Sequence, residues 1–149
     1  MQRPIAKIRV FVDTNVVFAG LASSGGASAA VLDLCEAEVI QMVLSRQVIV
    51  EADRNFSAKL PRLVGRFRQF MRSLGPTLIE DPGKSSVRKA AGIVGRKDAS
   101  ILAAAKESGV DFLITLDKKH FLSPRARKGA EVPVVTPAEF LHIFEKMGK

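Results

Sequence analysis

The chain of 149 residues has a single cysteine, two histidines, no tryptophan and no tyrosine. One cysteine excludes an internal disulfide, and the apolar neighbours of Cys35 favour a small core residue in a reducing compartment. No stretch approaches the roughly 20 consecutive apolar residues of a membrane span, and residues 1–7 lack the apolar core of a signal peptide. We therefore expect a cytoplasmic protein with no membrane partner.

The composition that remains is that of a folded domain. Hydrophobic residues make up 47% of the chain and charged residues 26%, which is ordinary for a globular protein, and the length fits one domain spanning residues 1–149. The formal charge is +8, from 23 basic and 15 acidic residues. Such an excess favours a polyanionic partner, because binding to phosphates releases condensed counterions.

Strand-like and helix-like segments alternate along the chain. Apolar runs predict strands at residues 7–12, 39–44, 78–79, 112–116 and 132–135. Three- and four-residue spacing, together with capping signals, predicts helices at residues 27–38, 46–57, 62–74, 85–94, 98–109 and from 137 onwards. Parallel strands need long crossovers, so this alternation indicates an α/β fold, a three-layer α/β/α sandwich with a central parallel sheet.

Acidic residues stand where two of the predicted strands end. Asp13 and Asp117 follow such strands, and ligands of open parallel sheets bind beyond the carboxyl ends of the strands. Asp98 opens the helix that leads into the second of these strands, and Glu51 lies in the helix after residues 39–44. Converging carboxylates repel one another unless a cation neutralises them, and oxygen ligands without cysteine favour Mg²⁺ or Mn²⁺ over zinc.

Structural roles for the same residues remain open at this stage. A turn or a helix cap is also a fitting role for each of Asp13, Asp98 and Asp117. Glu51 also fits an ion pair with Arg54 on a solvated helix face, in which case Asp53 is an available substitute. His120 is flanked by lysines, and we interpret it as a surface group and not as a ligand or base.

Five stretches in order resemble a PIN domain over nearly the whole chain. They are residues 11–15, Ser45 with Glu51, residues 98–105, residues 114–121 and residues 136–141. The resemblance implies a nuclease in which acidic residues hold one or two Mg²⁺ or Mn²⁺ ions that activate a water for in-line attack on a phosphodiester. The matching quartet, catalytic and metal-binding, is Asp13, Glu51, Asp98 and Asp117.

Further details follow from the same resemblance. Asn15 and Thr115 match polar residues that orient the ligands. Leu116 stands where relatives commonly have glycine and Lys97 where another acid is common, which leaves the fine geometry open. A chain that is nearly all PIN domain resembles an endoribonuclease toxin of the VapC type. That type implies a small antitoxin as partner and a homodimer.

Basic residues crowd the stretch after the last acid of the quartet. We expect four of them to grip RNA phosphates beside the metal site, namely Lys118, Lys119, Arg125 and Arg127. Other functions stay open, including an RNA-processing PIN nuclease without an antitoxin and a catalytically silent PIN domain that binds RNA or protein. An aspartyl phosphatase is disfavoured, because Asn15 stands where such an enzyme needs a second aspartate.

Overall fold

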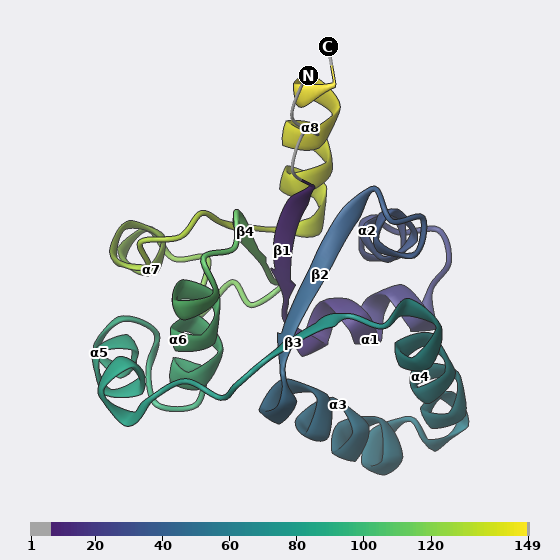
Figure 1. Cartoon of the computed structure of the whole chain (residues 1–149), viewed down its shortest axis with the longest axis horizontal. Helices are drawn as coiled ribbons and strands as arrows, with labels where there is room; N and C mark the ends of the chain where they lie inside the picture. Colours follow the sequence, from purple (N-terminus) through teal and green to yellow (C-terminus); the bar gives the residue numbers. More distant parts are fainter. Residues whose placement is uncertain (1–6, 149) are drawn as a thin grey trace, which may run out of the picture.

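A central parallel sheet organises the computed structural model, which describes residues 7–148 (Figure 1). The strands are β1 (Ile8–Val12), β2 (Ile40–Ser45), β3 (Thr77–Ile79), β4 (Phe112–Ile114) and β5 (Val134–Val135), in the order β3-β2-β1-β4-β5. All pairings are parallel, and the central strand β1 buries Val10, Phe11 and Val12 completely. A strand covered on both faces must be apolar throughout its inner part, as β1 is.

Helices cover both faces of this sheet and complete the predicted three-layer α/β sandwich. They are α1 (Thr14–Ala22), α2 (Ala27–Glu36), α3 (Arg46–Lys59), α4 (Pro61–Leu74), α5 (Lys84–Val94), α6 (Ala99–Ser108), α7 (Pro124–Gly129) and α8 (Pro137–Met147). In Figure 1, α5, α6 and α7 lie on one side of the sheet, and α1, α2 and α4 on the other. The fold class predicted from the alternation of elements is therefore confirmed.

Local capping chemistry sets several helix starts where the sequence predicts them. Ser45 caps α3 by accepting a hydrogen bond from the Val48 N–H at 3.3 Å. Thr136 and Glu139 form a reciprocal capping box at the start of α8, with proline at the first helical position. These side chains satisfy N–H groups that have no partner inside the helix, so the sheet-to-helix transitions occur at fixed residues.

Two helices, α1 and α7, are absent from the sequence prediction. Helix α1 begins directly after Asp13, and its buried side includes Gly20, where the helix packs closely against α2. A Cβ at Gly20 would lie 2.4 Å from Leu32 Cδ1, so glycine allows α1 to approach α2. Helix α7 begins with a capping serine, Ser123, followed by proline, just as α8 begins with a capping threonine followed by proline. That signal identifies α7 in retrospect.

A stack of phenylalanines joins the three helices beside the sheet edge. Phe56 of α3 stacks on Phe18 of α1 at 3.9 Å between ring centroids and on Phe67 of α4 at 4.7 Å. Phe67 and Phe70 are buried, and so is Cys35, which confirms its predicted place in the core. The stack fixes α3, the helix that carries Glu51, against α1.

No helix between residues 7 and 148 is by itself long and apolar enough to cross a membrane. Helices α1 and α2 reach that length and apolarity only as a pair, across a bend of 98°. The expectation about a leader sequence concerns mainly residues 1–6, which lie outside the described residues.

Candidate metal centre

The candidate site lies where the order of the sheet reverses. Connections run from β1 outward through β2 to β3, and the chain then crosses to β4 on the other side of β1. The carboxyl ends of β1 and β4 therefore flank the crevice at which ligands of open sheets bind. Asp13 follows β1 directly, and its backbone N–H donates to the Ile114 carbonyl at 2.9 Å. This places Asp13 and the loop after β4 side by side.

Asp13 is an almost fully buried carboxylate at this edge. It is 5% exposed, and the Thr115 hydroxyl donates to its Oδ2 at 2.7 Å. Although Asp13 occupies the N-cap position of α1, its side chain makes no capping hydrogen bond. Burial raises the pKa of Asp13 from 3.8 to about 6, against the lowering effect of the Thr115 hydrogen bond. The structure thus does not use Asp13 as a cap.

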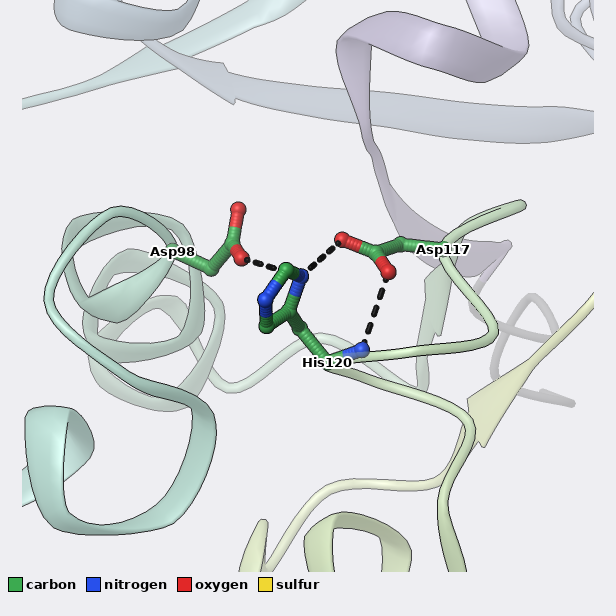
Figure 2. Close-up of side chains that lie close together, drawn as sticks. All are labelled: Asp98, Asp117 and His120. Atoms are coloured by element: carbon green, nitrogen blue, oxygen red, sulfur yellow. Dashed lines mark hydrogen bonds and ion pairs between the residues drawn. The ribbon is translucent and has the colours of Figure 1, made fainter.

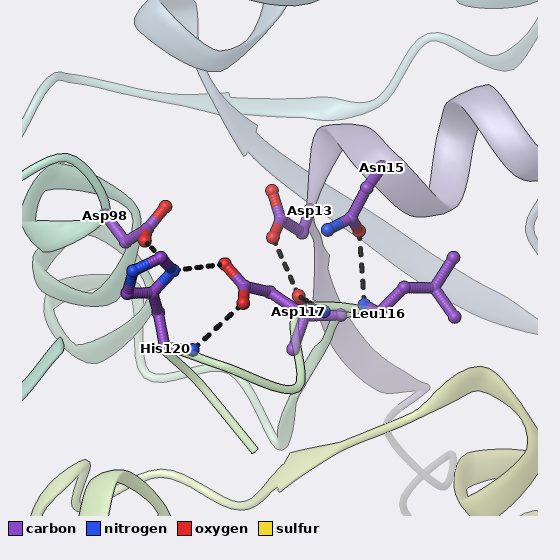
Figure 3. Close-up of polar contacts among 7 residues, drawn as sticks. Asp13, Asn15, Asp98, Leu116, Asp117 and His120 are labelled. Carbon is purple, nitrogen blue, oxygen red and sulfur yellow. Dashed lines mark hydrogen bonds and ion pairs between the residues drawn. The ribbon is translucent and has the colours of Figure 1, made fainter. Parts of the chain in front are cut away.

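Polar side chains brace the loop after β4 against β1 and α1 (Figure 3). The Leu116 N–H donates to Asn15 Oδ1 at 3.2 Å, and the Asp117 N–H donates to Thr115 Oγ1 at 3.1 Å. Thr115 therefore links two aspartates, because its hydroxyl donates to one while accepting from the backbone of the other. Leu116, which stands where glycine is common, still donates its backbone N–H to Asn15. Asn15 and Thr115 lie where orienting residues are needed.

Asp98 adds a second buried carboxylate from the other side of the cleft. It is 8% exposed and stands at the N-cap position of α6, yet its side chain makes no capping hydrogen bond. Its Oδ2 is buried and has no hydrogen-bond partner among residues 7–148. Burial and then the charge of Asp117 raise the pKa of Asp98 above its ordinary value. Buried carboxylate oxygens without a partner are costly in a folded protein.

Asp117 and His120 complete this side of the site (Figure 2). The His120 N–H donates to Asp117 Oδ1 at 2.9 Å, and His120 Nδ1 lies 3.0 Å from Asp117 Oδ2 and 3.4 Å from Asp98 Oδ2. Burial acts to raise the pKa of Asp117, but the hydrogen bonds from His120 outweigh it and hold this pKa below its ordinary value. One oxygen of Asp117 thus closes a turn, and the other faces the site.

His120 lies at the surface, as predicted, and also contacts the acidic centre. Its side chain is 42% exposed, but the ring contacts two carboxylates of the predicted quartet. In the part of the chain that the structure describes, the group whose ligand atoms all lie within 4.8 Å of one another is Asp98, Asp117 and His120. The signal in the sequence is the spacing of His120 from Asp117. Three residues across a tight turn bring the two side chains together.

Glu51 reaches the same cleft from α3 without joining that close group. It is exposed and lines a cleft of about 330 Å³ together with Asp13 and Asp98. No ion pair with Arg54 is present among residues 7–148, whereas Asp53 pairs with Arg68 at 2.8 Å and is thereby turned toward α4. Of the two acids on this helix, only Glu51 faces the cleft.

Two groups of basic side chains bear on the acidic centre, one that follows Asp117 in the chain and one that lines the cleft. Lys118, Lys119 and Arg125 are exposed after Asp117, and Arg127 forms a two-point ion pair with Glu139 at 3.1 and 3.2 Å. A second basic group, which was not predicted to bind RNA, lines the cleft itself, namely Arg54, Lys59 and Lys97. The cleft therefore combines an acidic floor with cationic walls.

The donors present fit a hard divalent cation. Two buried aspartates with raised pKa values, one of them with a buried carboxylate oxygen that lacks a hydrogen bond, indicate that the basic groups nearby do not fully neutralise the negative charge concentrated here. The helices α1 and α6 both begin at the site and direct the positive ends of their dipoles toward it, which offsets only part of this charge. Oxygen donors of this kind bind Mg²⁺ or Mn²⁺.

Solved structures with this fold come from several organisms. FitAcB from Neisseria gonorrhoeae is 19% identical with a TM-score of 0.59, covering 87% of this chain and 98% of that one. PAE2754 from Pyrobaculum aerophilum is 18% identical with a TM-score of 0.63, covering 93% and 90%. VapBC2 from Rickettsia felis, bound to a DNA fragment from its promoter, is 16% identical with a TM-score of 0.63, covering 87% and 98%.

The sequence itself identifies the family. No curated protein matches the chain significantly, but the family model of the PIN domain matches residues 9–119. The match runs from the central strand through the acid that follows β4, and so includes every acid of the predicted quartet. Because it spans most of the sequence and the structures above share the fold, this chain belongs to the PIN-domain family.

Proposed function

We propose that this protein is a metal-dependent endoribonuclease that uses Asp13, Glu51, Asp98 and Asp117 to hold Mg²⁺ or Mn²⁺. Members of its family are typically nucleases. The observation that carries the proposal is the unpartnered, buried Oδ2 of Asp98, set among carboxylates at the switch point of the sheet. A fold that needed Asp98 only as a cap would use this carboxylate to cap, and it does not.

Each side chain has a task in hydrolysis. When bound, the divalent cation lowers the pKa of a water and balances charge that develops on the phosphate. Thr115 holds Asp13 in a fixed orientation, and Asn15 holds the loop that carries Asp117. Glu51, at the open rim of the cleft, accepts a proton or a hydrogen bond from a water on that side. No protein nucleophile is required, so the chain contributes positioning and electrostatics.

The cleft walls suggest how the polyanion is held. Arg54, Lys59 and Lys97 line the same cleft as the acids, and a phosphodiester that reaches the acids passes between them. The cluster predicted from the sequence follows Asp117 in the chain and consists of Lys118, Lys119, Arg125 and Arg127. Since Arg127 is already paired with Glu139, we expect the cleft-wall residues to contribute more to binding than Arg127 does.

Removing the cleft-wall charges will weaken RNA binding in a salt-dependent way. For the double variant Arg54→Ala/Lys59→Ala, we expect the slope of log K against log salt for single-stranded RNA to become shallower by about 1.4, because two phosphate contacts are lost. Fluorescence anisotropy in EDTA measures binding without cleavage. The matched control is Arg72→Ala/Lys146→Ala, which removes equal charge from the last turns of α4 and α8. Equal slopes for both double variants would contradict the assignment.

We further propose that the nuclease is the toxin of a toxin-antitoxin pair in the cytoplasm, active as a homodimer and inhibited by a small antitoxin. The fold likeness to VapBC2 supports this proposal over an RNA-processing role without an antitoxin. Expression from an inducible promoter should arrest growth, and co-expression of a short reading frame from the neighbouring gene should relieve the arrest. Growth that continues at full rate with active enzyme in the cell would favour the processing role.

Metal removal tests the enzyme directly. Purified protein incubated with a structured RNA should cleave it in Mn²⁺ or Mg²⁺ and not in EDTA, and re-addition of the cation should restore cleavage. DNA of the same sequence serves as the comparison substrate and distinguishes a ribonuclease from a general nuclease. Cleavage that persists in EDTA would contradict a mechanism that depends on these carboxylates and a cation.

A further inference from the structure

We propose that His120 is a nitrogen ligand for a second divalent cation held together with Asp98 and Asp117, and that this ligand makes the site prefer Mn²⁺ to Mg²⁺. The inference rests on the proposed metal-dependent function, but it adds a ligand that the acidic quartet lacks. It concerns the group of Asp98, Asp117 and His120, which lies beside the cleft formed by Asp13, Glu51 and Asp98. Asp98 belongs to both groups.

The distances within this group are close to those between neighbouring ligands of one ion. In octahedral geometry, bonds of about 2.1 Å separate adjacent ligands by about 3.0 Å. His120 Nδ1 lies 3.0 Å from Asp117 Oδ2 and 3.4 Å from Asp98 Oδ2. In Figure 2 the imidazole ring stands between the two carboxylates and directs Nδ1 toward both.

Hydrogen bonding alone does not account for the arrangement. His120 Nδ1 carries at most one proton, and its contact with Asp117 Oδ2 at 3.0 Å is a hydrogen bond. Asp98 Oδ2, in contrast, is buried and lacks a hydrogen bond despite lying 3.4 Å from the same nitrogen. One proton serves only one of the two carboxylates, whereas a cation coordinated by all three groups serves both.

The backbone holds the ring in this position. The His120 N–H donates to Asp117 Oδ1, so the turn that presents the imidazole is fixed by the same carboxylate that it faces. Asp117 consequently keeps its Oδ2 for the ion while Oδ1 secures the turn. The turn therefore places the imidazole beside both carboxylates, which favours coordination over a chance surface contact.

An imidazole changes which ions the site prefers. Mg²⁺ takes oxygen ligands almost exclusively and sheds water reluctantly, whereas first-row transition ions accept imidazole nitrogen readily. We therefore expect the ring to strengthen Mn²⁺ binding and to leave Mg²⁺ binding nearly unchanged. Affinity should rise further from Mn²⁺ to Co²⁺, as the Irving–Williams order requires of a nitrogen-containing site.

Pulsed electron paramagnetic resonance on the Mn²⁺-loaded protein tests the ligand directly. The chain has only two histidines, His120 and His142, so coordinated imidazole nitrogen is assigned with two variants. We expect ¹⁴N modulation in the wild type and in His142→Ala, and its loss in His120→Ala. The alanine variant retains the backbone N–H that bonds to Asp117. Wild-type protein labelled with [¹⁵N]histidine should show ¹⁵N in place of ¹⁴N modulation, which makes the result independent of any variant.

Affinities provide a second readout. In titrations, His120→Ala should raise the Mn²⁺ dissociation constant roughly tenfold or more, and the Mg²⁺ constant less than about threefold. Bound Mn²⁺ without histidine modulation in the wild type would overturn this proposal and leave the proposed nuclease intact. A wild-type protein that binds no Mn²⁺ at all would overturn both.

Discussion

Asp13→Asn will lower the rate of RNA cleavage in saturating Mn²⁺ by about a thousandfold or more. The carboxylate is almost fully buried at the centre of the site, and the amide that replaces it carries no charge to hold a cation. Loss of a metal-centred stabilisation of several kcal/mol in the transition state corresponds to such a factor, since each 1.4 kcal/mol is tenfold in rate. Single-turnover cleavage of a labelled RNA measures the effect.

The matched control for this variant is Asp53→Asn. Asp53 lies on α3 two residues from Glu51, but its carboxylate pairs with Arg68 and is directed away from the cleft. We expect this variant to retain cleavage within about threefold of the wild type, because an exposed ion pair contributes at most about 1 kcal/mol to stability. A comparable loss in both variants would indicate a general structural defect, and full activity in Asp13→Asn would refute the site.

Asp13→Asn will also stabilise the metal-free protein at neutral pH. Burial raises the pKa of Asp13 from 3.8 to about 6, so ionising this carboxyl in the folded chain costs about 3 kcal/mol relative to the unfolded chain. Asparagine has no such cost, and its carbonyl oxygen still accepts from the Thr115 hydroxyl. We therefore expect Asp13→Asn to exceed the wild type by about 3 kcal/mol in free energy of unfolding at pH 8 in EDTA.

The pH dependence has a definite sign. Well below pH 4 the Asp13 carboxyl is protonated in the folded and unfolded chains, so the two proteins should be nearly equally stable. As the pH rises through 3.8 toward 6, the unfolded chain ionises first and the wild type loses stability relative to the variant. Well above pH 6, where the folded chain is ionised as well, the difference stays constant. Urea unfolding from pH 4 to pH 8 measures this difference in free energy of unfolding. A wild type whose stability rises relative to that of Asp13→Asn as the pH rises would contradict a raised pKa for Asp13.

Mn²⁺ should make the wild type more stable than Asp13→Asn at neutral pH, the reverse of the order expected without metal. A cation that binds only the folded protein adds stability according to its concentration and affinity, and the wild type binds it more tightly than Asp13→Asn. Asp13→Asn should thus lower the cleavage activity in Mn²⁺ while it raises the stability of the metal-free protein. This trade-off is expected when charges are brought together for function and not for folding.

Much of this architecture follows from the sequence alone. The apolar runs that become β1, β2 and β4 are recognisable because a strand buried on both faces needs apolar residues throughout. Asp13 and Asp117 are placed by the rule that ligands gather beyond the carboxyl ends of parallel strands, and both lie at that edge. Ser45 and Thr136 set helix starts through local hydrogen bonds, which depend only on neighbours in the chain.

The tertiary structure decided the contacts between residues distant in sequence. Helix α1 remained hidden because it is apolar on most sides, so no periodic pattern marks it, and only its packing against α2 through Gly20 defines it. Local chemistry does not separate Glu51 from Asp53, which only the family resemblance does, but the position of α4 gives Asp53 a partner and leaves Glu51 facing the cleft. Local patterns carry no information about which face of a helix its neighbours will cover.

By itself, then, the sequence determined the fold class, the family resemblance and the acids at the strand ends, because these depend on local chemistry and chain order. Only the tertiary structure showed that Asp98 is buried without a hydrogen bond and that His120 lies against both Asp98 and Asp117. Those properties arise from desolvation and from contacts between α6 and the loop after β4. Both come into existence only when the folded elements exclude water from between them.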